Sequence, residues 1–234
     1  QYFNDDRIIL IEDNKFSLTK KKRYWADNHK LLQVLDETNN NISPNTQQRL
    51  IDKLLSIIDN NTKLVFCDYR TGFFTKNLCE NIFKSINHVD LCFIDSQCHR
   101  HSPRYEWFEG CIPVMNTEEA EKNFCIKLDS NDSVDKLLKK INIKYPLIIK
   151  NGKKGVIGIN DGVIYTEEGL NVNAIDTCGA GDAFLASFVY NFTGDNFHES
   201  LKFANEWAAC STTLLGTLPV KKEYFEEKQK WNMA

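Results

Sequence analysis

The chain has 234 residues, of which 42% are hydrophobic and 26% are charged, and its formal net charge is -3. These values predict a folded chain with a sizeable core and argue against intrinsic disorder. The small net charge gives no basis for a nucleic-acid or acidic-membrane partner. No apolar run approaches the roughly 18 residues of a membrane span, and no signal-peptide pattern opens the chain, so we expect a cytoplasmic protein.

Eight cysteines are scattered singly, at positions 67, 79, 92, 98, 111, 125, 178 and 210. There is no CxxC pair and no regular spacing, which argues against zinc ribbons and disulfide frameworks. Several of these cysteines lie in apolar runs, where a reduced thiol behaves as a small hydrophobe. We therefore expect buried free thiols.

The N-terminal part predicts a strand, a hairpin and a helix. Residues 7–12 (RIILIE) have the composition of a short strand. Residues 19–34 mix polar and aromatic side chains around a turn at 26–29, which predicts a two-stranded hairpin exposed on at least one face. Ser43 and Pro44 are an N-cap and a proline at the first helical position, and apolar residues follow at helical spacing to position 58.

From residue 63 onward, short apolar runs alternate with helical patterns. The predicted strands cover residues 63–67, 90–95, 112–115, 147–150, 156–159 and 163–165, and the last two are joined by a hairpin turn at 160–162. Helices are predicted at residues 75–86, from 117, at 133–141, at 180–191 and at 197–215. Strands that alternate with helices imply an α/β fold, with a mostly parallel central sheet covered by helices.

A glycine loop precedes the helix predicted at residues 180–191 and has the sequence I-D-T-C-G-A-G-D-A-F from residue 175. Glycines let a ligand approach the backbone, and the free N–H groups and the dipole of a helix start favour an anion. In the first turn, the carboxylate of Asp182 is suited to accept the proton of a hydroxyl that attacks a phosphate. The structural alternative is a common glycine turn with Asp182 as an ordinary charge.

The string D-T-x-G-A-G-D at residues 176–182 is similar to the C-terminal signature of the ribokinase, or PfkB-type, carbohydrate kinases. The resemblance implies a ribokinase-like sandwich, ATP as the phosphoryl donor and Asp182 as the catalytic base. It also implies an anion hole made by the amides of Gly179, Ala180 and Gly181. A Walker A sequence is absent from the chain, which disfavours a P-loop kinase.

Other positions resemble nucleotide-binding positions of the same family. Thr177 matches one that contacts nucleotide phosphates, and Asp176 matches one that in some members helps to hold a monovalent cation such as K⁺. Asn116 and Glu119 follow a predicted strand and look like the family's N-x-x-E, which organises Mg–ATP, with Glu119 acting on Mg²⁺ largely through water. A helix with an Asn cap and an acidic first turn would look the same.

Asn151 and Gly152 resemble the turn that passes close to ATP in this family, although a simple hairpin turn also explains them. Asn205 and Gly216 resemble positions of the helix and loop that flank the adenine. For Asn205, a solvated helix asparagine is the alternative.

The predicted hairpin resembles the K-x-R … N-x-x-L-L stretch of bacterial D-glycero-D-manno-heptose-7-phosphate kinases. There it belongs to a β-lid that covers the sugar and often pairs with a second subunit, which implies a lid-mediated homodimer. Lys21 and Arg23 suit an anionic sugar phosphate. The alternative is an exposed edge strand whose lysines block aggregation.

The resemblance covers essentially the whole chain but only about the C-terminal two thirds of a complete family member. It divides the chain into a β-lid segment at residues 1–36 and a ribokinase-like core at 37–234 that lacks its first βαβ region. We expect the full gene product to have a segment ahead of Gln1.

Together, these features predict an ATP- and Mg²⁺-dependent sugar kinase whose acceptor is a sugar or sugar phosphate, with heptose 7-phosphate as a candidate. Two alternatives remain. One is a kinase for another acceptor, such as ribose, fructose or a nucleoside, and the other is a catalytically silent subunit that binds nucleotide or sugar.

Overall fold

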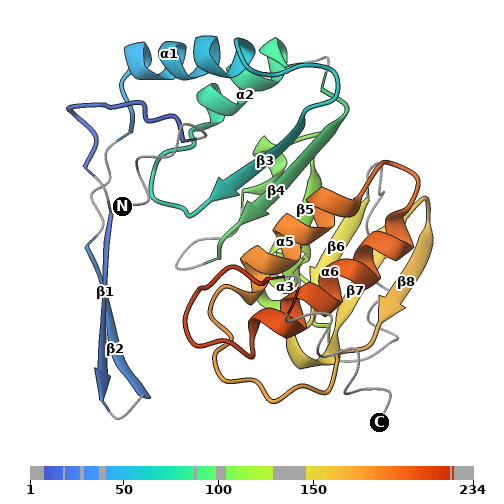
Figure 1. Ribbon diagram of the computed structural model, residues 1–234. Coiled ribbons are helices and arrows are strands. Elements are labelled where there is room, and N and C mark those ends of the chain that lie inside the picture. The colour runs from blue at the N-terminus through green and yellow to red at the C-terminus, as the bar shows by residue number, and fades with distance from the viewer. Residues whose placement is uncertain are drawn as a thin grey trace. The chain divides into compact units, whose positions relative to one another are not determined.

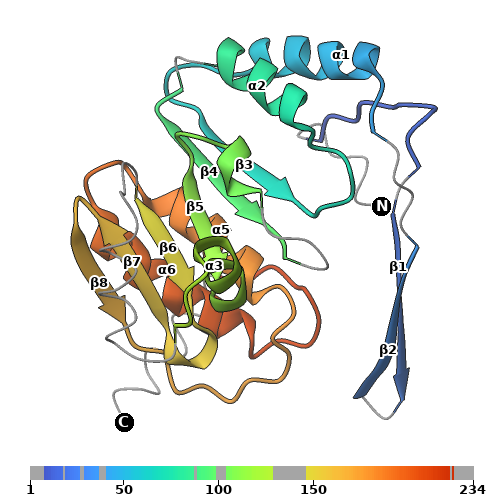
Figure 2. The same cartoon turned by 180° about the vertical axis from the view of Figure 1, so that it is seen from behind.

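The computed structural model describes residues 8–17, 19–26, 29–36, 41–86, 89–98, 104–128, 146–221 and 223. The chain forms two compact units (Figures 1 and 2). The first comprises residues 1–62 and 68–90, and the second comprises residues 63–67 and 91–234. The helix predicted at residues 133–141 lies outside the described residues.

In the first unit, β1 (Lys20–Ala26) and β2 (His29–Asp36) form the predicted antiparallel hairpin. Tyr24 pairs with Leu32, and Lys22 pairs with Val34. Because side chains alternate along a strand, Tyr24, Leu32 and Val34 share one face of the hairpin with Lys22. The three apolar residues are 52%, 56% and 42% exposed, so this apolar part of the face is open.

The strand predicted at residues 7–12 is wrong over its described part, because residues 8–12 have no regular structure. Ile8 and Leu10 are exposed, and no strand of the described chain pairs with them. The segment leads instead to Asp13, whose carboxylate accepts hydrogen bonds from the N–H groups of Ser43 (2.6 Å) and Lys15 (2.8 Å). An apolar run becomes a strand only where a neighbouring strand satisfies its backbone.

Two capped helices complete the first unit. The helix α1 (Pro44–Leu55) begins at the predicted N-cap Ser43, whose hydroxyl accepts the N–H of Thr46 at 3.3 Å. It ends before the predicted position 58, since residues 56 and 57 form a turn. The helix α2 (Lys76–Ser85) begins at the N-cap Thr75 and contacts α1.

The second unit holds a six-stranded sheet in the order β3-β4-β5-β6-β7-β8. The strands are β3 (Lys63–Asp68), β4 (Leu91–Ser96), β5 (Ile112–Asn116), β6 (Leu147–Lys150), β7 (Val156–Asn160) and β8 (Val163–Glu167). The pairs β4–β5 and β5–β6 are parallel, whereas β6–β7 and β7–β8 are antiparallel. Asp161 and Gly162 have positive φ values of 50° and 75°, as the predicted hairpin turn between β7 and β8 requires.

The apolar run at residues 63–67 forms the predicted strand β3, but the strand is only partly buried. Val65 is 40% exposed and the Cys67 thiol is exposed, because β3 is the outermost strand at its side of the described sheet. All eight cysteines are free, as expected. The prediction of burial is confirmed for four of them, which are Cys79, Cys92, Cys111 and Cys210. It is wrong for the other four, which are Cys67, Cys98, Cys125 and Cys178.

Helices cover both faces of this sheet (Figures 1 and 2). The helices α5 (Ala180–Asn191) and α6 (Phe197–Ser211) lie side by side on one face, and α3 (Thr117–Phe124) lies on the other. Short 3-10 turns are η1 (Tyr105–Trp107) and η2 (Gly152–Lys154). The α6 helix ends at Ser211 rather than at the predicted position 215, since turns follow it.

An aromatic core holds α5 and α6 on the sheet. The ring of Phe188 is fully buried and lies 5.2 to 6.3 Å, between ring centroids, from the rings of Phe93, Phe184, Phe192 and Phe197. This packing holds α5 against the sheet, and the glycine loop directly precedes the helix. The observed α/β architecture, with a mostly parallel central sheet covered by helices and a separate β-hairpin, confirms the predicted fold class.

Candidate active site

Polar side chains gather where β4, β5 and β6 end, beside the start of α5. Asp95 lies near the end of β4, and Lys150 is the last residue of β6. The Lys150 ammonium donates a hydrogen bond of 2.8 Å to Oδ2 of Asp95, and both side chains are about 15% exposed, at 15% and 16%. A methyl group built on Gly181 would lie 3.3 Å from Lys150 Nζ, so the first turn of α5 is close to this ion pair.

Asn116 and Glu119 form a capping box at the start of α3. Oδ1 of Asn116 accepts the N–H of Glu119 at 2.9 Å, and Oε2 of Glu119 accepts the N–H of Asn116 at 2.7 Å. The next residue, Thr117, donates its hydroxyl to the backbone O of Lys150 (3.3 Å) and to Oδ1 of Asn151 (3.1 Å). These bonds connect the N-x-x-E segment to the end of β6, although the two segments are far apart in the sequence.

Glu119 is a buried carboxyl group, with 4% of its surface exposed. Burial raises the pKa of Glu119 to about 7, and the negative charge of Asp95 raises it further, whereas the bond from Asn116 and the charge of Lys150 oppose the shift. A buried carboxyl group that favours its neutral form would be stabilised as a carboxylate by a nearby cation.

The glycine loop is tied to the segment that follows α6. The carboxylate of Asp176 accepts the N–H groups of Cys178 (2.9 Å) and Gly216 (3.1 Å). Gly179 has a φ of 84°, and a methyl group built on it would lie 2.8 Å from Cγ2 of Thr217. Position 179 therefore requires glycine for two reasons: the left-handed backbone and the closeness of the neighbouring chain.

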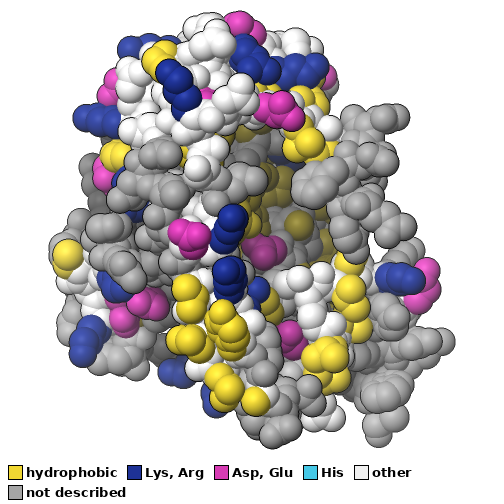
Figure 3. All heavy atoms as spheres, turned by 90° about the vertical axis from the view of Figure 1, so that its left-hand side faces the viewer, with side chains coloured by type: hydrophobic (Ala, Val, Ile, Leu, Met, Phe, Trp, Pro, Cys, Tyr) yellow, Lys and Arg dark blue, Asp and Glu magenta, His cyan; other side chains and the backbone are white. Residues whose placement is uncertain are grey.

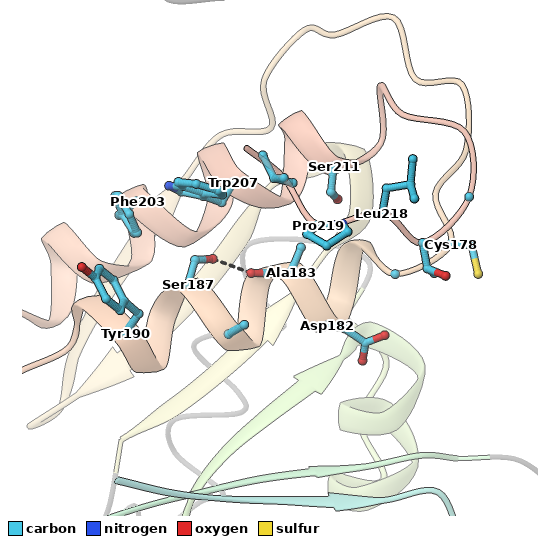
Figure 4. A pocket seen from close by; sticks show the side chains of 15 residues that line it. Cys178, Asp182, Ala183, Ser187, Tyr190, Phe203, Trp207, Ser211, Leu218 and Pro219 are labelled. Carbon is cyan, nitrogen blue, oxygen red and sulfur yellow. Dashed lines mark hydrogen bonds between the residues drawn. The ribbon is translucent and has the colours of Figure 1, made fainter. Parts of the chain in front are cut away.

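A cavity of about 970 Å³ starts at this loop and follows the groove between α5 and α6. Figure 4 shows Asp182, Cys178 and Leu218 at one end of the groove and Tyr190 and Phe203 at the other. The lining is largely apolar, and the other residues around it are Gly179, Ala183, Ala186, Ser187, Trp207, Ser211, Gly216, Thr217, Pro219 and Val220. Other hydrophobic side chains are exposed on the face of the chain that Figure 3 shows.

The predicted residues of the glycine loop and the β5–β6 edge are thus brought together, but Asn205 is placed apart. Its side-chain amide donates to the backbone O of Glu168 at 2.7 Å, and only 8% of it is exposed. The alternative of a solvated helix asparagine is therefore wrong, and Asn205 does not line the cavity. Thr177 is exposed in the loop, and Gly152 lies in η2 with a φ of 56°.

The two predicted sugar-binding residues belong to the first unit. The backbone of Lys21 pairs with that of Leu35, and its side chain lies outside what the structure describes. The exposed Arg23 donates through Nε to Oε1 of Gln33 at 3.1 Å, across the hairpin.

Asp95 and Lys150 were not among the residues that the sequence singled out for chemistry. Each ends or nearly ends a predicted strand, and ligands of open α/β sheets bind at the carboxyl ends of strands. That rule applies to Asn116, and it applies equally to Asp95 and Lys150. Only the strand order, which places β4 and β6 on either side of β5, shows that they meet.

Comparison with known families identifies this part of the chain. Residues 111–222, which carry the N-x-x-E segment and the glycine loop, match the pfkB family carbohydrate kinases. This region is similar to a pfkB domain. The matched region contains every residue of the polar cluster and of the glycine loop except Asp95, which lies on the preceding strand.

Curated relatives extend the similarity beyond the matched region. The bifunctional protein HldE of Sulfurimonas denitrificans is 25% identical over 234 residues, which cover 96% of this chain and 47% of that protein. Fructokinase-2 of Oryza sativa subsp. japonica is 33% identical over 48% of this chain and 35% of its own length. The chain therefore spans about half of the length of the HldE proteins that it matches.

Solved structures show the same fold. Phosphofructokinase-2 from Escherichia coli, in complex with potassium, superposes with a TM-score of 0.68 at 14% identity, over 87% of this chain and 67% of that one. Arabidopsis thaliana ribokinase, complexed with ribose and ATP, gives 0.64 at 16% identity, over 86% and 65% of the two chains. Among the described residues, no helix is long and apolar enough to cross a membrane.

Proposed function

We propose that this chain is an ATP-dependent sugar kinase that transfers the γ-phosphoryl group to a hydroxyl of a sugar or sugar phosphate. One observation carries the proposal: the carboxylate of Asp182 lies in the first turn of α5, directly after the glycine loop and at the end of a cavity large enough for a nucleotide. Asp182 takes the proton of the attacking hydroxyl, as general base.

The start of α5 supplies the anion-binding part of the site. The N–H groups of Gly179, Ala180 and Gly181 precede or open the helix, where the helix dipole adds partial positive charge. They stabilise the negative charge that develops on the phosphates during transfer. Thr177 contacts the phosphates from the exposed side of the same loop, and Gly216 and Gly152 allow the nucleotide close approach to the backbone.

Mg²⁺ fits the edge that holds Asn116 and Glu119. The residues present are oxygen donors, and the buried Glu119 is a carboxyl group that a dication would convert to its charged form. The described chain holds no group of three metal-ligating side chains, so the remaining ligands would be waters and phosphate oxygens, as Mg²⁺ prefers. Bound there, Mg²⁺ neutralises phosphate charge.

A K⁺ ion is proposed near Asp176, next to the anion-binding loop. Its carboxylate already binds the N–H groups of Cys178 and Gly216, so this residue would act mainly by holding the two loops around the ion. The phosphofructokinase-2 complex with potassium supports a monovalent cation in this fold.

For the acceptor we propose heptose 7-phosphate. The support is the hairpin with Lys21 and Arg23, whose cationic groups suit a sugar phosphate, together with the HldE proteins that match 96% of the chain. In this proposal residues 1–36 are the lid segment and residues 37–234 are the catalytic core.

A lid-mediated homodimer follows from the open face of the hairpin. A two-stranded hairpin is at best marginally stable in water. Tyr24, Leu32 and Val34 form an exposed apolar patch on one face of it, beside Lys22, and a second copy of the same hairpin would cover that patch.

The test is an ATP-consumption screen over heptose phosphates, hexoses, pentoses and nucleosides, with Asp182→Asn as the control for contaminating kinases. Turnover with heptose 7-phosphate alone would support the full proposal. Turnover with ribose, fructose or a nucleoside instead would keep the kinase and overturn the acceptor. ATP binding without turnover on any acceptor would favour a catalytically silent subunit.

A further inference from the structure

The ion pair between Lys150 and Asp95 has a position that the proposed mechanism does not yet use. Lys150 ends β6, and its ammonium lies close to Gly181. A methyl group built on this glycine would lie 3.3 Å from Lys150 Nζ. Gly181 is one of the residues whose amides form the proposed anion site. The ammonium therefore lies beside the first turn of α5.

The charges around this point are mostly negative. Although Cys67 on β3 is exposed overall, partial desolvation of its thiol raises the thiol pKa, the carboxylates of Asp95 and Asp182 raise it further, and Lys150 lowers it. The buried Glu119 experiences the same opposition between Asp95 and Lys150. The positive charge of Lys150 thus acts on both Cys67 and Glu119, where it opposes the nearby carboxylates. In the proposed function, the same site must bind a polyanionic nucleotide.

The surroundings of Lys150 also suit phosphate binding. An ammonium has three N–H donors, and Asp95 receives one of them at 2.8 Å, so a phosphate oxygen can be bound while the ion pair persists. Because Lys150 and Asp95 are only 15% and 16% exposed, water screens their charges less than at an open surface. The fixed carboxylate restricts a side chain that is otherwise long and flexible.

We propose that Lys150 binds the terminal phosphate of ATP and stabilises the charge of the transferred phosphoryl group, and that Asp95 is its positioning residue. This assignment rests on the proposed kinase function. The chain has no Walker A lysine, and Lys150 supplies the equivalent charge from the end of a strand rather than from a P-loop. Together with Mg²⁺, it offsets the carboxylates that surround the site.

The experiment compares the binding of ATP and ADP, each with Mg²⁺, by isothermal titration calorimetry. A contact to the terminal phosphate is lost in ADP, so Lys150→Met should lower the ratio of ATP to ADP affinity roughly tenfold or more. Lys150→Arg keeps the charge and should retain most of the ratio. Lys84→Met, in the exposed last turn of α2 and outside the candidate site, is the matched control and should leave the ratio unchanged.

Removing Lys150 alone leaves the largely buried carboxylate of Asp95 without its ion-pair partner, which destabilises the folded protein. The double variant Asp95→Asn/Lys150→Met removes both charges and should show the same loss of ATP preference. An unchanged ratio in Lys150→Met and in the double variant would overturn the inference while leaving the kinase proposal intact. If the wild-type chain binds neither nucleotide, the kinase proposal itself fails, and this assignment fails with it.

Discussion

The backbone N–H of Asn116 donates a 2.7 Å hydrogen bond to the carboxylate of Glu119, and the N–H of Glu119 returns one of 2.9 Å to the Asn116 side chain. This reciprocal pair starts α3 and holds a carboxyl group inside the protein. The helix-cap and magnesium-site interpretations of N-x-x-E therefore do not exclude each other. The cap positions the residue that, in the proposed function, acts on the metal.

Glu119→Gln should change how stability depends on pH. Burial raises the pKa of Glu119 from 4.5 to about 7 in the folded protein, so between these values the folded state holds a proton that the unfolded state has lost. The free energy of unfolding consequently falls as the pH rises from about 4.5 to about 7, by about 3 kcal/mol at most. Glutamine does not titrate, and this fall should be absent from the variant.

Urea unfolding at several pH values across this window, in protein free of divalent metal, measures the effect. Glu118→Gln removes an exposed carboxylate from the same helical turn and should keep the wild-type slope. A wild-type slope in Glu119→Gln would show that this carboxyl group is not the one that titrates.

Asp182→Asn should retain nucleotide binding and lose turnover by roughly 100- to 10,000-fold, because the amide cannot take the proton of the attacking hydroxyl. Steady-state kinetics with the acceptor identified by the screen, and calorimetric ATP binding, separate the two effects. Asp161→Asn is the control: it removes a carboxylate from the β7–β8 turn, and asparagine tolerates the φ of 50° there. Near-normal turnover of Asp182→Asn would refute the assignment of the base.

Gly179→Ala should lower the affinity for ATP by more than its loss of folding stability can explain. A φ of 84° costs an alanine about 1 to 2 kcal/mol, and its methyl group would lie 2.8 Å from Cγ2 of Thr217, so the Thr217 side chain must move. Gly110→Ala is matched, with a φ of 89° and nothing within 4 Å of the added methyl group. Equal losses of ATP affinity in the two variants would contradict a specific role of the Gly179–Thr217 contact.

Leu32→Lys should dissociate the proposed homodimer, because it places a charge in the middle of the apolar hairpin face, opposite Tyr24. Sedimentation velocity measures the change in mass. Gln33→Glu adds a charge on the opposite face of the same strand, where Gln33 pairs with Arg23, and should leave the assembly as it is. A monomeric wild-type protein would rule out the dimer directly.

Much of this protein is determined by local sequence. Ser43 and Pro44 start α1, Asp161 and Gly162 turn β7 into β8, and the boundaries of α5 agree with the sequence pattern at both ends. These features depend on backbone preferences and capping bonds within a few residues, which a single sequence expresses directly. The chemistry assigned to residues 176–182 has the same local origin.

Tertiary structure decided what depends on distant neighbours. Residues 8–12 have a strand composition and no strand beside them, Cys67 lies in an apolar run yet is exposed on β3, and Asn205 is turned to the backbone of Glu168. The pairing of Lys150 with Asp95 joins residues 55 positions apart and depends on the strand order. Burial and charge pairing are properties of the assembled sheet, and so the sequence alone could name the loop proposed to bind phosphate but not the lysine beside it.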